Sequence, residues 1–261
     1  MSIFKRALVQ VFSASKLGNS TVKGHADSGL NIDHMYRKSP KGISFFGRFL
    51  DSILLNLPSV KATRVKKDII IKILQNEVAN NVVLGKKTRI IDLASGPARY
   101  LVDLINESNH GSIEALCLDS DKRSINYGKI LAHKKPIRYT KANVFRLGAL
   151  KHFSDRVHWI PNVVIATGFF EMQKDDVVKM FLNDINKHLD TGGLILFTGQ
   201  ADNPSKKLMK YVGKTQAGGA WELYLRQPET FRKWLLDAGF RDVIISLDQL
   251  GMYEYCTGRK V

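Results

Sequence analysis

Apolar positions repeat with two different spacings along the chain, and the spacing changes near residue 87. Residues 60–80 carry Val65, Ile69 and Ile73 at steps of four, which predicts a helix with one inward face. From residue 87 onward, short apolar runs alternate with longer amphipathic stretches. The short runs predict strands at 89–93, 113–118, 137–142, 162–166 and 194–198. The longer stretches predict helices at 98–106, 122–133, 175–189 and 228–238.

The order of these elements predicts an α/β fold. Strands that alternate with helices form a parallel sheet with helices on both faces. Two more strands are predicted at 242–247 and 252–257, with a tight turn near Gly251, so the last strand should run antiparallel. The sequence therefore predicts a Rossmann-like sheet of seven strands behind a helical and loop-containing N-terminal cap.

The N-terminal part of the chain lacks this alternation. Residues 1–24 are expected to be flexible or to form a short amphipathic helix, rather than a signal peptide. Residues 25–86 are expected to form a cap or lid, whose stretch 25–58 is rich in the turn-forming residues glycine and proline. Residues 87–261 form the predicted α/β domain.

The charge of the chain is uneven. The net charge is +16, and residues 1–87 hold 15 Lys and Arg against 5 Asp and Glu. A basic face attracts nucleic acid, an anionic membrane or an acidic small molecule, or is only solvated surface, and charge alone does not choose. Cys117 and Cys256 lie in apolar runs, which favours buried free thiols and a cytoplasmic location. No transmembrane segment and no metal site are expected, because the sequence has no run of ~20 apolar residues and no CxxC or histidine cluster.

Small and polar residues follow the predicted strands, where ligands bind in open α/β sheets. After the first strand, Gly96 lets the backbone pass close to a ligand, and the next helix offers free N–H groups. After the second strand, Asp119 can accept hydrogen bonds from both hydroxyls of a ribose. It lies 23 residues beyond Gly96, near the spacing of a nucleoside-binding βαβ unit.

The third and fourth strands end on further candidate residues. The amide of Asn143 can pair with the exocyclic amine of an adenine, and Gly168 lies in a turn against which a ligand can rest. Each signal alone is common, since an Asp after a strand is more often a helix N-cap. Their order and spacing together predict a nucleoside-binding site.

These motifs resemble those of class I S-adenosylmethionine (SAM)-dependent methyltransferases over residues 88–258. The segments IIDLASGPARYLVDL, LCLDSDKRSINYGK, KANVF, VVIATGFFEM and LDTGGLILFTG are similar to the five motifs of that family in order. Ala94 and Ala98 replace common glycines, and Asn143 replaces an acid. The predicted cofactor-binding set is Tyr36, Asp92, Ala94, Ser95, Gly96, Arg99, Asp119, Ser120, Asn143, Val144, Thr167 and Gly168.

The N-terminal part carries a narrower resemblance. The segment SGLNIDHMYRKSPKGISFFGRFLDSILLN, with the later TGQADNP and AWELYLRQPETFRKWLLDAGF, resembles a family described only as "putative methyltransferases". This resemblance implies that the cap belongs to the same functional unit. We expect it to form a lid that orders over bound SAM, with Tyr36 reaching the cofactor, and the alternative is a static surface segment.

Several side chains have two readings. Arg99 pairs with the SAM carboxylate or is a solvated helix residue. Glu171 could act as a catalytic base or could fix the loop in which it lies, and the second role is favoured. Trp234 lies on an apolar helix face and is expected in the core, whereas Trp221 is a candidate for an acceptor pocket. The histidines, His34 among them, show no ligand spacing and are assigned no role.

The predicted reaction is an in-line methyl transfer that yields S-adenosylhomocysteine (SAH). The departing sulfur is neutral, so no metal is needed, and no catalytic base is assigned. A nicotinamide-binding protein would carry GxGxxG where this chain has ASGPAR, which argues against a nicotinamide cofactor. An NPPY-type sequence is missing after the fourth strand, which argues against amino-group methylation of nucleobases or glutamine. A small-molecule or lipid-like acceptor is favoured. The alternatives to this function are RNA methylation and a SAM-binding protein that uses the sulfonium for other chemistry. The sequence leaves peripheral membrane contact open and does not determine the oligomeric state.

Overall fold

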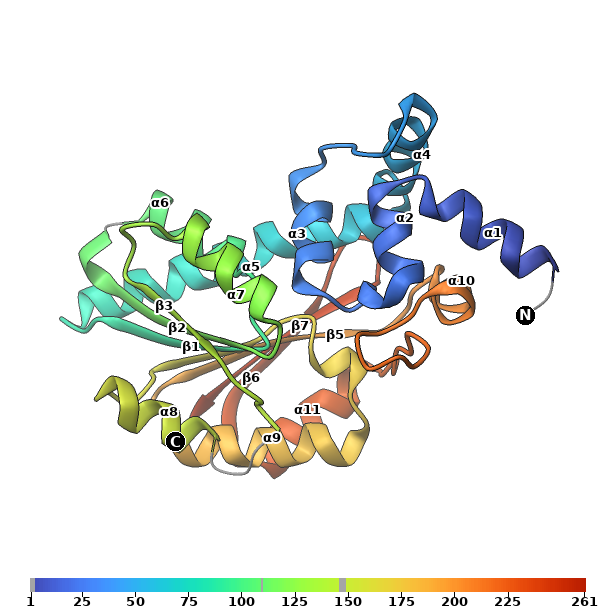
Figure 1. The fold of residues 1–261 in the computed structure, drawn as a ribbon. Helices are drawn as coiled ribbons and strands as arrows, with labels where there is room; N and C mark the ends of the chain where they lie inside the picture. Colours follow the sequence, from blue (N-terminus) through green and yellow to red (C-terminus); the bar gives the residue numbers. More distant parts are fainter. Residues whose placement is uncertain (1–2, 109, 146–148) are drawn as a thin grey trace. The chain divides into compact units, whose positions relative to one another are not determined.

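The computed structural model describes residues 3–108, 110–145 and 149–261, so the first two residues of the predicted N-terminal segment lie outside it. The described residues form one seven-stranded sheet (Figure 1). The strands are β1 (Thr88–Leu93), β2 (Ile113–Asp119), β3 (Ile137–Lys141), β4 (Val163–Ala166), β5 (Leu194–Gln200), β6 (Phe240–Leu247) and β7 (Tyr253–Lys260).

The strands are ordered β3-β2-β1-β4-β5-β7-β6. Neighbours from β3 to β5 are parallel, whereas β7 runs antiparallel to both β5 and β6. The predicted α/β fold with an antiparallel last strand is confirmed. The chain order reverses between β1 and β4, and such a switch point is where open α/β sheets bind ligands at the carboxyl ends of their strands.

Helices cover both faces of the sheet (Figure 1). Four were predicted within a few residues of their ends: α6 (Arg99–Glu107), α7 (Lys122–Leu131), α9 (Asp175–His188) and α11 (Pro228–Asp237). Four further elements were not predicted from the sequence: α8 (Ala149–Val157), α10 (Lys206–Val212) and the short 3-10 turns η2 (His110–Ser112) and η3 (Phe170–Met172). The predicted helix over 60–80 is part of the longer α5 (Pro58–Val83).

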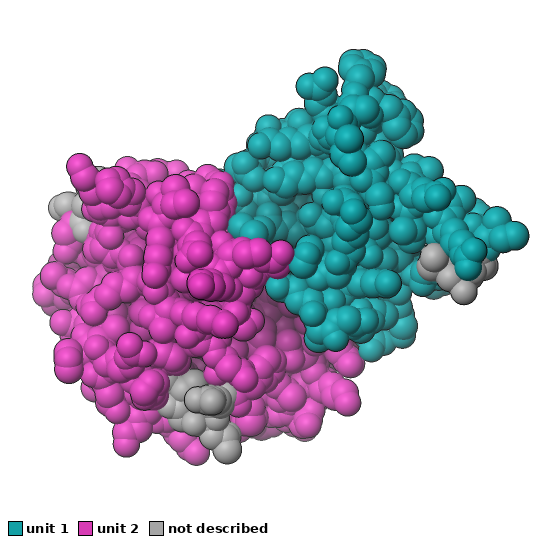
Figure 2. Space-filling view, in the orientation of Figure 1, with its two compact units in different colours: residues 1–67, 203–223 teal, residues 68–202, 224–261 magenta. Residues whose placement is uncertain are grey.

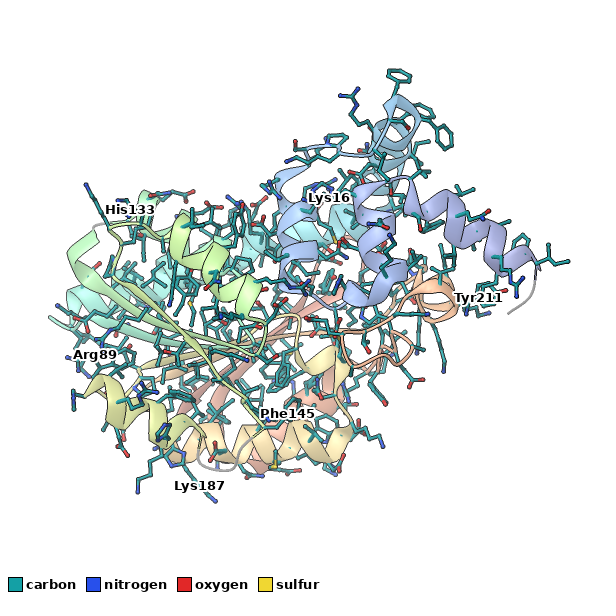
Figure 3. All side chains as sticks on the ribbon, viewed as in Figure 1. Lys16, Arg89, His133, Phe145, Lys187 and Tyr211 are labelled. Carbon is teal, nitrogen blue, oxygen red and sulfur yellow. The ribbon has the colours of Figure 1, made fainter. Side chains whose placement is uncertain are left out.

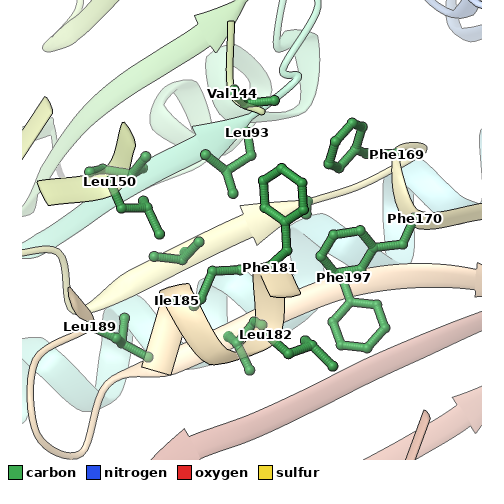
Figure 4. Packing of buried hydrophobic residues seen from close by; sticks show 14 of the residues in the cluster. Leu93, Val144, Leu150, Phe169, Phe170, Phe181, Leu182, Ile185, Leu189 and Phe197 are labelled. Atoms are coloured by element: carbon green, nitrogen blue, oxygen red, sulfur yellow. The ribbon is translucent and has the colours of Figure 1, made fainter. Parts of the chain in front are cut away.

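The main core fills the face of the sheet that carries α8, α9 and α11. Figure 4 shows its centre, where Phe169, Phe170, Phe181 and Phe197 meet close to Leu93 of β1. The Phe170 and Phe197 ring centroids are 5.0 Å apart with tilted planes, an edge-to-face arrangement that aromatic pairs prefer. This packing anchors the segment that follows β4, because Phe169 and Phe170 come directly after Gly168.

The chain forms two compact units, shown in two colours in Figure 2. Unit 1 comprises residues 1–67 and 203–223, and unit 2 comprises residues 68–202 and 224–261. These limits differ from the predicted divisions after residues 24 and 86. The later segment joins unit 1 because Ala26 N–H donates to the Lys214 carbonyl over 3.0 Å, and Lys214 N–H donates to the Thr21 carbonyl over 2.9 Å.

The prediction of a loop-rich stretch over residues 25–58 is wrong. Two helices lie there, α3 (Gly29–Arg37) and α4 (Phe45–Leu55). Each begins after a serine that caps it: Ser28 accepts from Leu30 N–H and Ser44 accepts from Gly47 N–H. Gly29 and Gly47, two of the glycines that suggested loops, lie inside these helices, whereas Gly42 lies between them. Most of residues 3–25 are also helical, as α1 (Ile3–Ser13), α2 (Lys16–Ser20) and the turn η1 (Thr21–His25), which is kinked at Lys23 and Gly24.

A buried carboxylate ties the helices of unit 1 together. Asp51 of α4 accepts hydrogen bonds from Leu17 N–H at 2.7 Å, from Lys41 N–H at 2.8 Å and from His34 Nε2 at 2.8 Å. Burial acts to raise the pKa of Asp51, but the bonds from His34, Leu17 and Lys41 outweigh it and lower that pKa. His34, which the sequence analysis assigned no role, is therefore a structural partner.

None of the helices in the described part of the chain combines the length and the apolar character that crossing a membrane requires.

Candidate functional site

The turn after β1 has an unusual backbone. Ala94, Gly96 and Ala98 all have positive φ, at +53°, +56° and +50°. An L-residue pays about 1–2 kcal/mol for the left-handed conformation, which glycine adopts freely. The chain nevertheless keeps this turn with alanines at two of the three positions. The replacement of common glycines therefore leaves the turn conformation in place and adds two methyl groups to it.

Asp119 joins this turn to the end of β2. Its Oδ2 accepts from Gly96 N–H at 2.7 Å, and its Oδ1 accepts from Asp121 N–H at 2.7 Å. Ser95 N–H also donates to the Leu118 carbonyl at 3.0 Å. The Ser120 backbone N–H is a third donor to this carboxylate, which has about four acceptor positions and so keeps room for a further donor such as a ribose hydroxyl. Burial raises the pKa of Asp119, and the backbone bonds act against that rise.

Asp92 lies deeper than the rest of the predicted set. Its side chain is fully buried, and the Tyr100 hydroxyl donates to its Oδ2. Its Oδ1 has no hydrogen-bond partner among the described residues. Burial raises the pKa of Asp92 to about 8, with the Tyr100 bond opposing and the nearby Asp119 charge adding to the rise. Asp92 therefore carries its proton over most of the neutral range.

The turn after β4 is held from the neighbouring strand. Gly168, with φ +71°, donates its N–H to Thr198 Oγ1 of β5 at 2.9 Å. The Thr198 hydroxyl in turn donates to Glu171 Oε1 at 3.2 Å. Thr167, next to this turn, hydrogen-bonds Tyr100, which counteracts part of the rise that burial causes in the pKa of Tyr100. These contacts favour the loop-holding role of Glu171 over a role as base.

The end of β3 presents an amide and an aromatic ring. Asn143 is exposed, and its Oδ1 accepts from Phe145 N–H at 3.0 Å, while Val144 is buried beside it. Phe145, labelled in Figure 3, is 47% exposed, and its ring centroid lies 5.6 Å from that of Phe169. The sequence analysis missed Phe145, although an aromatic residue two positions after the predicted adenine contact was a usable signal.

The remaining predicted cofactor residues are placed as follows. Ser120 is exposed at the tip of β2. Arg99 Nη2 donates to the Tyr127 hydroxyl of α7 at 3.2 Å, so its guanidinium is held by protein rather than freely solvated. Tyr36 lies on α3, which belongs to unit 1, whereas the other predicted cofactor residues belong to unit 2. Its contact with a cofactor stays a prediction.

A second buried carboxyl group lies near the end of β5 and was also missed. Glu254 of β7 is fully buried, and neither of its oxygens has a hydrogen-bond partner among the described residues. A Cβ added at Gly199 would come within 2.6 Å of its Oε2, so the glycine makes room for the carboxyl. Burial raises the pKa of Glu254 to about 7, with the Glu171 charge adding and Arg226 opposing.

The tryptophans discussed above and the two cysteines are buried side chains. Trp234 packs edge-on against Phe231 in the main core, as predicted. Trp221 is buried against Gly213 within unit 1. Cys117 and Cys256 are buried free thiols, as predicted. Among the described residues, no group of three or more His, Cys, Asp or Glu side chains is arranged to hold a metal ion.

The sheet order, the antiparallel β7 and the turns at the β1–β4 switch point are those of a class I methyltransferase domain. Comparison with known families agrees with this class. Residues 4–260 match the model of the family described as "Putative methyltransferase", and the chain belongs to that family.

One curated relative is "Uncharacterized protein YnbC" of Escherichia coli (strain K12). It is 25% identical over 261 residues, which cover 96% of this chain and 43% of YnbC. The chain thus spans less than half the length of this relative.

Solved structures share the fold at low identity. A possible exported protein of Bordetella parapertussis has a TM-score of 0.74 at 16% identity, over 98% of this chain and 87% of that protein. A magnesium protoporphyrin IX methyltransferase of Synechocystis PCC 6803, solved with bound SAH, has a TM-score of 0.56 at 12% identity, over 89% of this chain and 95% of its own. Both likenesses concern the fold.

Proposed function

We propose that this chain is a SAM-dependent methyltransferase that acts on a small-molecule or lipid-like acceptor and releases SAH. The observation that carries the proposal is the link between Gly96 and Asp119. It brings the left-handed turn after β1 and the acidic end of β2 together at the switch point of the sheet.

The residues of unit 2 fit the parts of SAM. Asp119 keeps room to accept a hydrogen bond from a ribose hydroxyl, and Asn143 with the Phe145 ring suits an adenine. The turn from Ala94 to Gly96 brings bare backbone close to the methionine part.

The chain itself contributes position and order. SAM, when bound, supplies a methyl group on a sulfonium, and the leaving sulfur is neutral. Catalysis of such a transfer comes mainly from holding the acceptor in line with the methyl group. Thr198 fixes the Gly168 turn, and Glu171 fixes Thr198, so the wall of the site beside β4 is set before any acceptor arrives.

The preference for a small or lipid-like acceptor comes from the segment after β4. The residues Ala166-Thr167-Gly168-Phe169 stand where an NPPY-type sequence serves amino-group methylation of nucleobases or glutamine. The main core closes around Phe169 and Phe170 at this point, which makes the end of β4 apolar behind the turn. An apolar wall suits an acceptor with hydrocarbon or aromatic character.

Titration calorimetry with SAH tests the proposal. The wild-type chain should bind SAH at micromolar concentration or below without added metal. Asp119→Ala should weaken binding tenfold or more, because a charge-assisted hydrogen bond is worth about 1.5–3 kcal/mol and ~1.4 kcal/mol is tenfold. Asp176→Ala, at an exposed carboxylate of α9, is the matched control and should bind like the wild type.

Two results would contradict the proposal. If the folded wild-type chain gives no heat of binding with SAH, the assignment of SAM as the cofactor is wrong. Equal affinities of the Asp119 and Asp176 variants would mean that another group holds the ribose, and the assigned geometry would then be wrong.

A further inference from the structure

Helix α4 has apolar side chains on two opposite faces. One face is buried and includes Gly47, Asp51 and Leu54. The other face points to solvent and is made of large apolar side chains, here called the α4 aromatic face: Phe45, Phe46, Phe49 and Ile53. A surface helix normally turns its apolar stripe to the core and polar side chains to solvent. The outward face of α4 therefore needs an explanation other than packing within unit 1.

The buried face fixes the orientation of the helix. A Cβ added at Gly47 would come within 2.2 Å of the Ala14 carbonyl oxygen, so backbone packs on backbone there. On the same face Asp51 takes three hydrogen bonds, from Leu17, Lys41 and His34. Helix α4 cannot rotate to hide its aromatic face without breaking these contacts.

The aromatic face is highly exposed. Phe45 is 81% exposed, and Ile43, just before the helix, is 90% exposed. Figure 3 shows ring side chains standing away from α4. Single exposed apolar residues are common, but a contiguous group of this size usually marks a binding surface. Helix α1 adds a second such surface to unit 1, because it has no buried residues and exposes both Phe4 and Val11.

The charge of unit 1 indicates the partner. Unit 1 holds 16 Lys and Arg against 4 Asp and Glu, a net charge of +12 of the total +16. Three of these basic residues, Lys38, Lys41 and Arg48, are exposed within a few positions of the aromatic face. An apolar helix face bordered by basic side chains is typical of helices that lie in the surface of an anionic lipid bilayer.

We propose that unit 1 docks on an anionic lipid surface through the α4 aromatic face, with Lys38, Lys41 and Arg48 on the phospholipid headgroups. This inference is independent of methyl transfer. A second copy of the chain fits less well, because a face-to-face pair would bring these cations together. RNA fits less well too: the three Phe rings could stack on bases, but Ile43 and Ile53 beside them offer bases no ring, whereas hydrocarbon chains of lipid suit all of these side chains.

Vesicle flotation at low and high salt tests the proposal. The probes are vesicles of phosphatidylcholine with added phosphatidylglycerol, and of phosphatidylcholine alone. The wild-type chain should float with the anionic vesicles and bind the neutral ones at least tenfold more weakly at low salt. Phe45→Ser with Phe49→Ser should lower binding to anionic vesicles tenfold or more. Both positions are exposed, and circular dichroism should show an unchanged fold.

A matched control comes from unit 2. Ile130 and Lys129 are exposed neighbours on α7, and Ile130→Ser with Lys129→Glu should leave vesicle binding unchanged. Lys41→Glu with Arg48→Glu should weaken binding mainly at low salt, because salt already screens these charges at high concentration.

Three results would overturn the proposal. The first is equal vesicle binding by the wild type and the Phe45/Phe49 variant. The second is a dimer in sedimentation that the Phe45/Phe49 variant loses, without vesicle binding by the wild type. The third is salt-dependent binding of a single-stranded RNA by the wild-type chain, without any binding to vesicles. SAH binding, measured in parallel, separates failure of the docking from failure of the cofactor site.

Discussion

The buried carboxyl group of Glu254 makes the stability of unit 2 depend on pH in an unusual direction. Its pKa rises from 4.5 to about 7 because it is buried without a hydrogen-bond partner among the described residues and faces the Glu171 charge. Each pH unit is worth ~1.36 kcal/mol, so ionising Glu254 in the folded state costs about 3 kcal/mol.

The sign of the effect follows from proton binding. Between pH 4.5 and 7 the folded chain holds a proton on Glu254 that the unfolded chain has released. The free energy of unfolding therefore falls as the pH rises through this window, and the full penalty is present above pH 7. Glu254→Gln is neutral at every pH. The variant should match the wild type near pH 4.5 and be about 3 kcal/mol more stable at pH 8.

Urea unfolding followed by tryptophan fluorescence measures this difference. Trp221→Phe as the common background leaves Trp159 and Trp234, which both lie in the core of unit 2. Asp237→Asn is the control, since this carboxylate of α11 is exposed and surface changes usually alter stability by less than ~0.5 kcal/mol. A Glu254→Gln stability difference that stays constant from pH 4.5 to pH 8 would refute the reasoning.

Two further predictions concern the hydrogen bonds that hold each unit. Asp51→Ala should destabilise unit 1 by about 3–5 kcal/mol, because it leaves His34 and two N–H donors buried without their acceptor, and faster hydrogen exchange in α3 and α4 would show it. Unchanged exchange there would contradict the assigned role. Thr198→Val keeps the side-chain shape but leaves Gly168 N–H without its acceptor, at about 1–3 kcal/mol. In the Thr198→Val variant, the SAH affinity and the midpoint of thermal unfolding should both fall. If both equal those of the wild type, the Gly168 turn needs no support from Thr198.

The sheet could be predicted because its signal is local. The central parallel strands are buried on both faces, so they appear in the sequence as apolar runs such as Ile113–Leu118 and Leu194–Thr198. The turns after the strands carry small and acidic residues for the same local reason. The fold class and the clustering of Gly96 with Asp119 therefore followed from the sequence.

The missed features depend on contacts between distant positions or on capping. Helices α3 and α4 begin at Ser28 and Ser44, whose capping bonds outweigh the glycines beside them. The bond between His34 and Asp51 spans 17 residues and gives no periodic signal. The burial of Glu254 depends on the absence of a side chain at Gly199, a relation between two strands that pairing alone reveals.

The composition of unit 1 has a consequence for how the protein is made. Residues 203–223 complete this unit by accepting and donating backbone hydrogen bonds at Thr21, Ala26 and Lys214. A ribosome adds roughly 5–20 residues per second, so the first 67 residues wait on the order of ten seconds for that segment. During this interval the nascent chain holds unit 1 incomplete while β1 to β5 emerge. Assembly of unit 1 is thus timed by the synthesis of the sheet, because residues 1–67 are translated before the sheet and complete their backbone hydrogen bonds only after it.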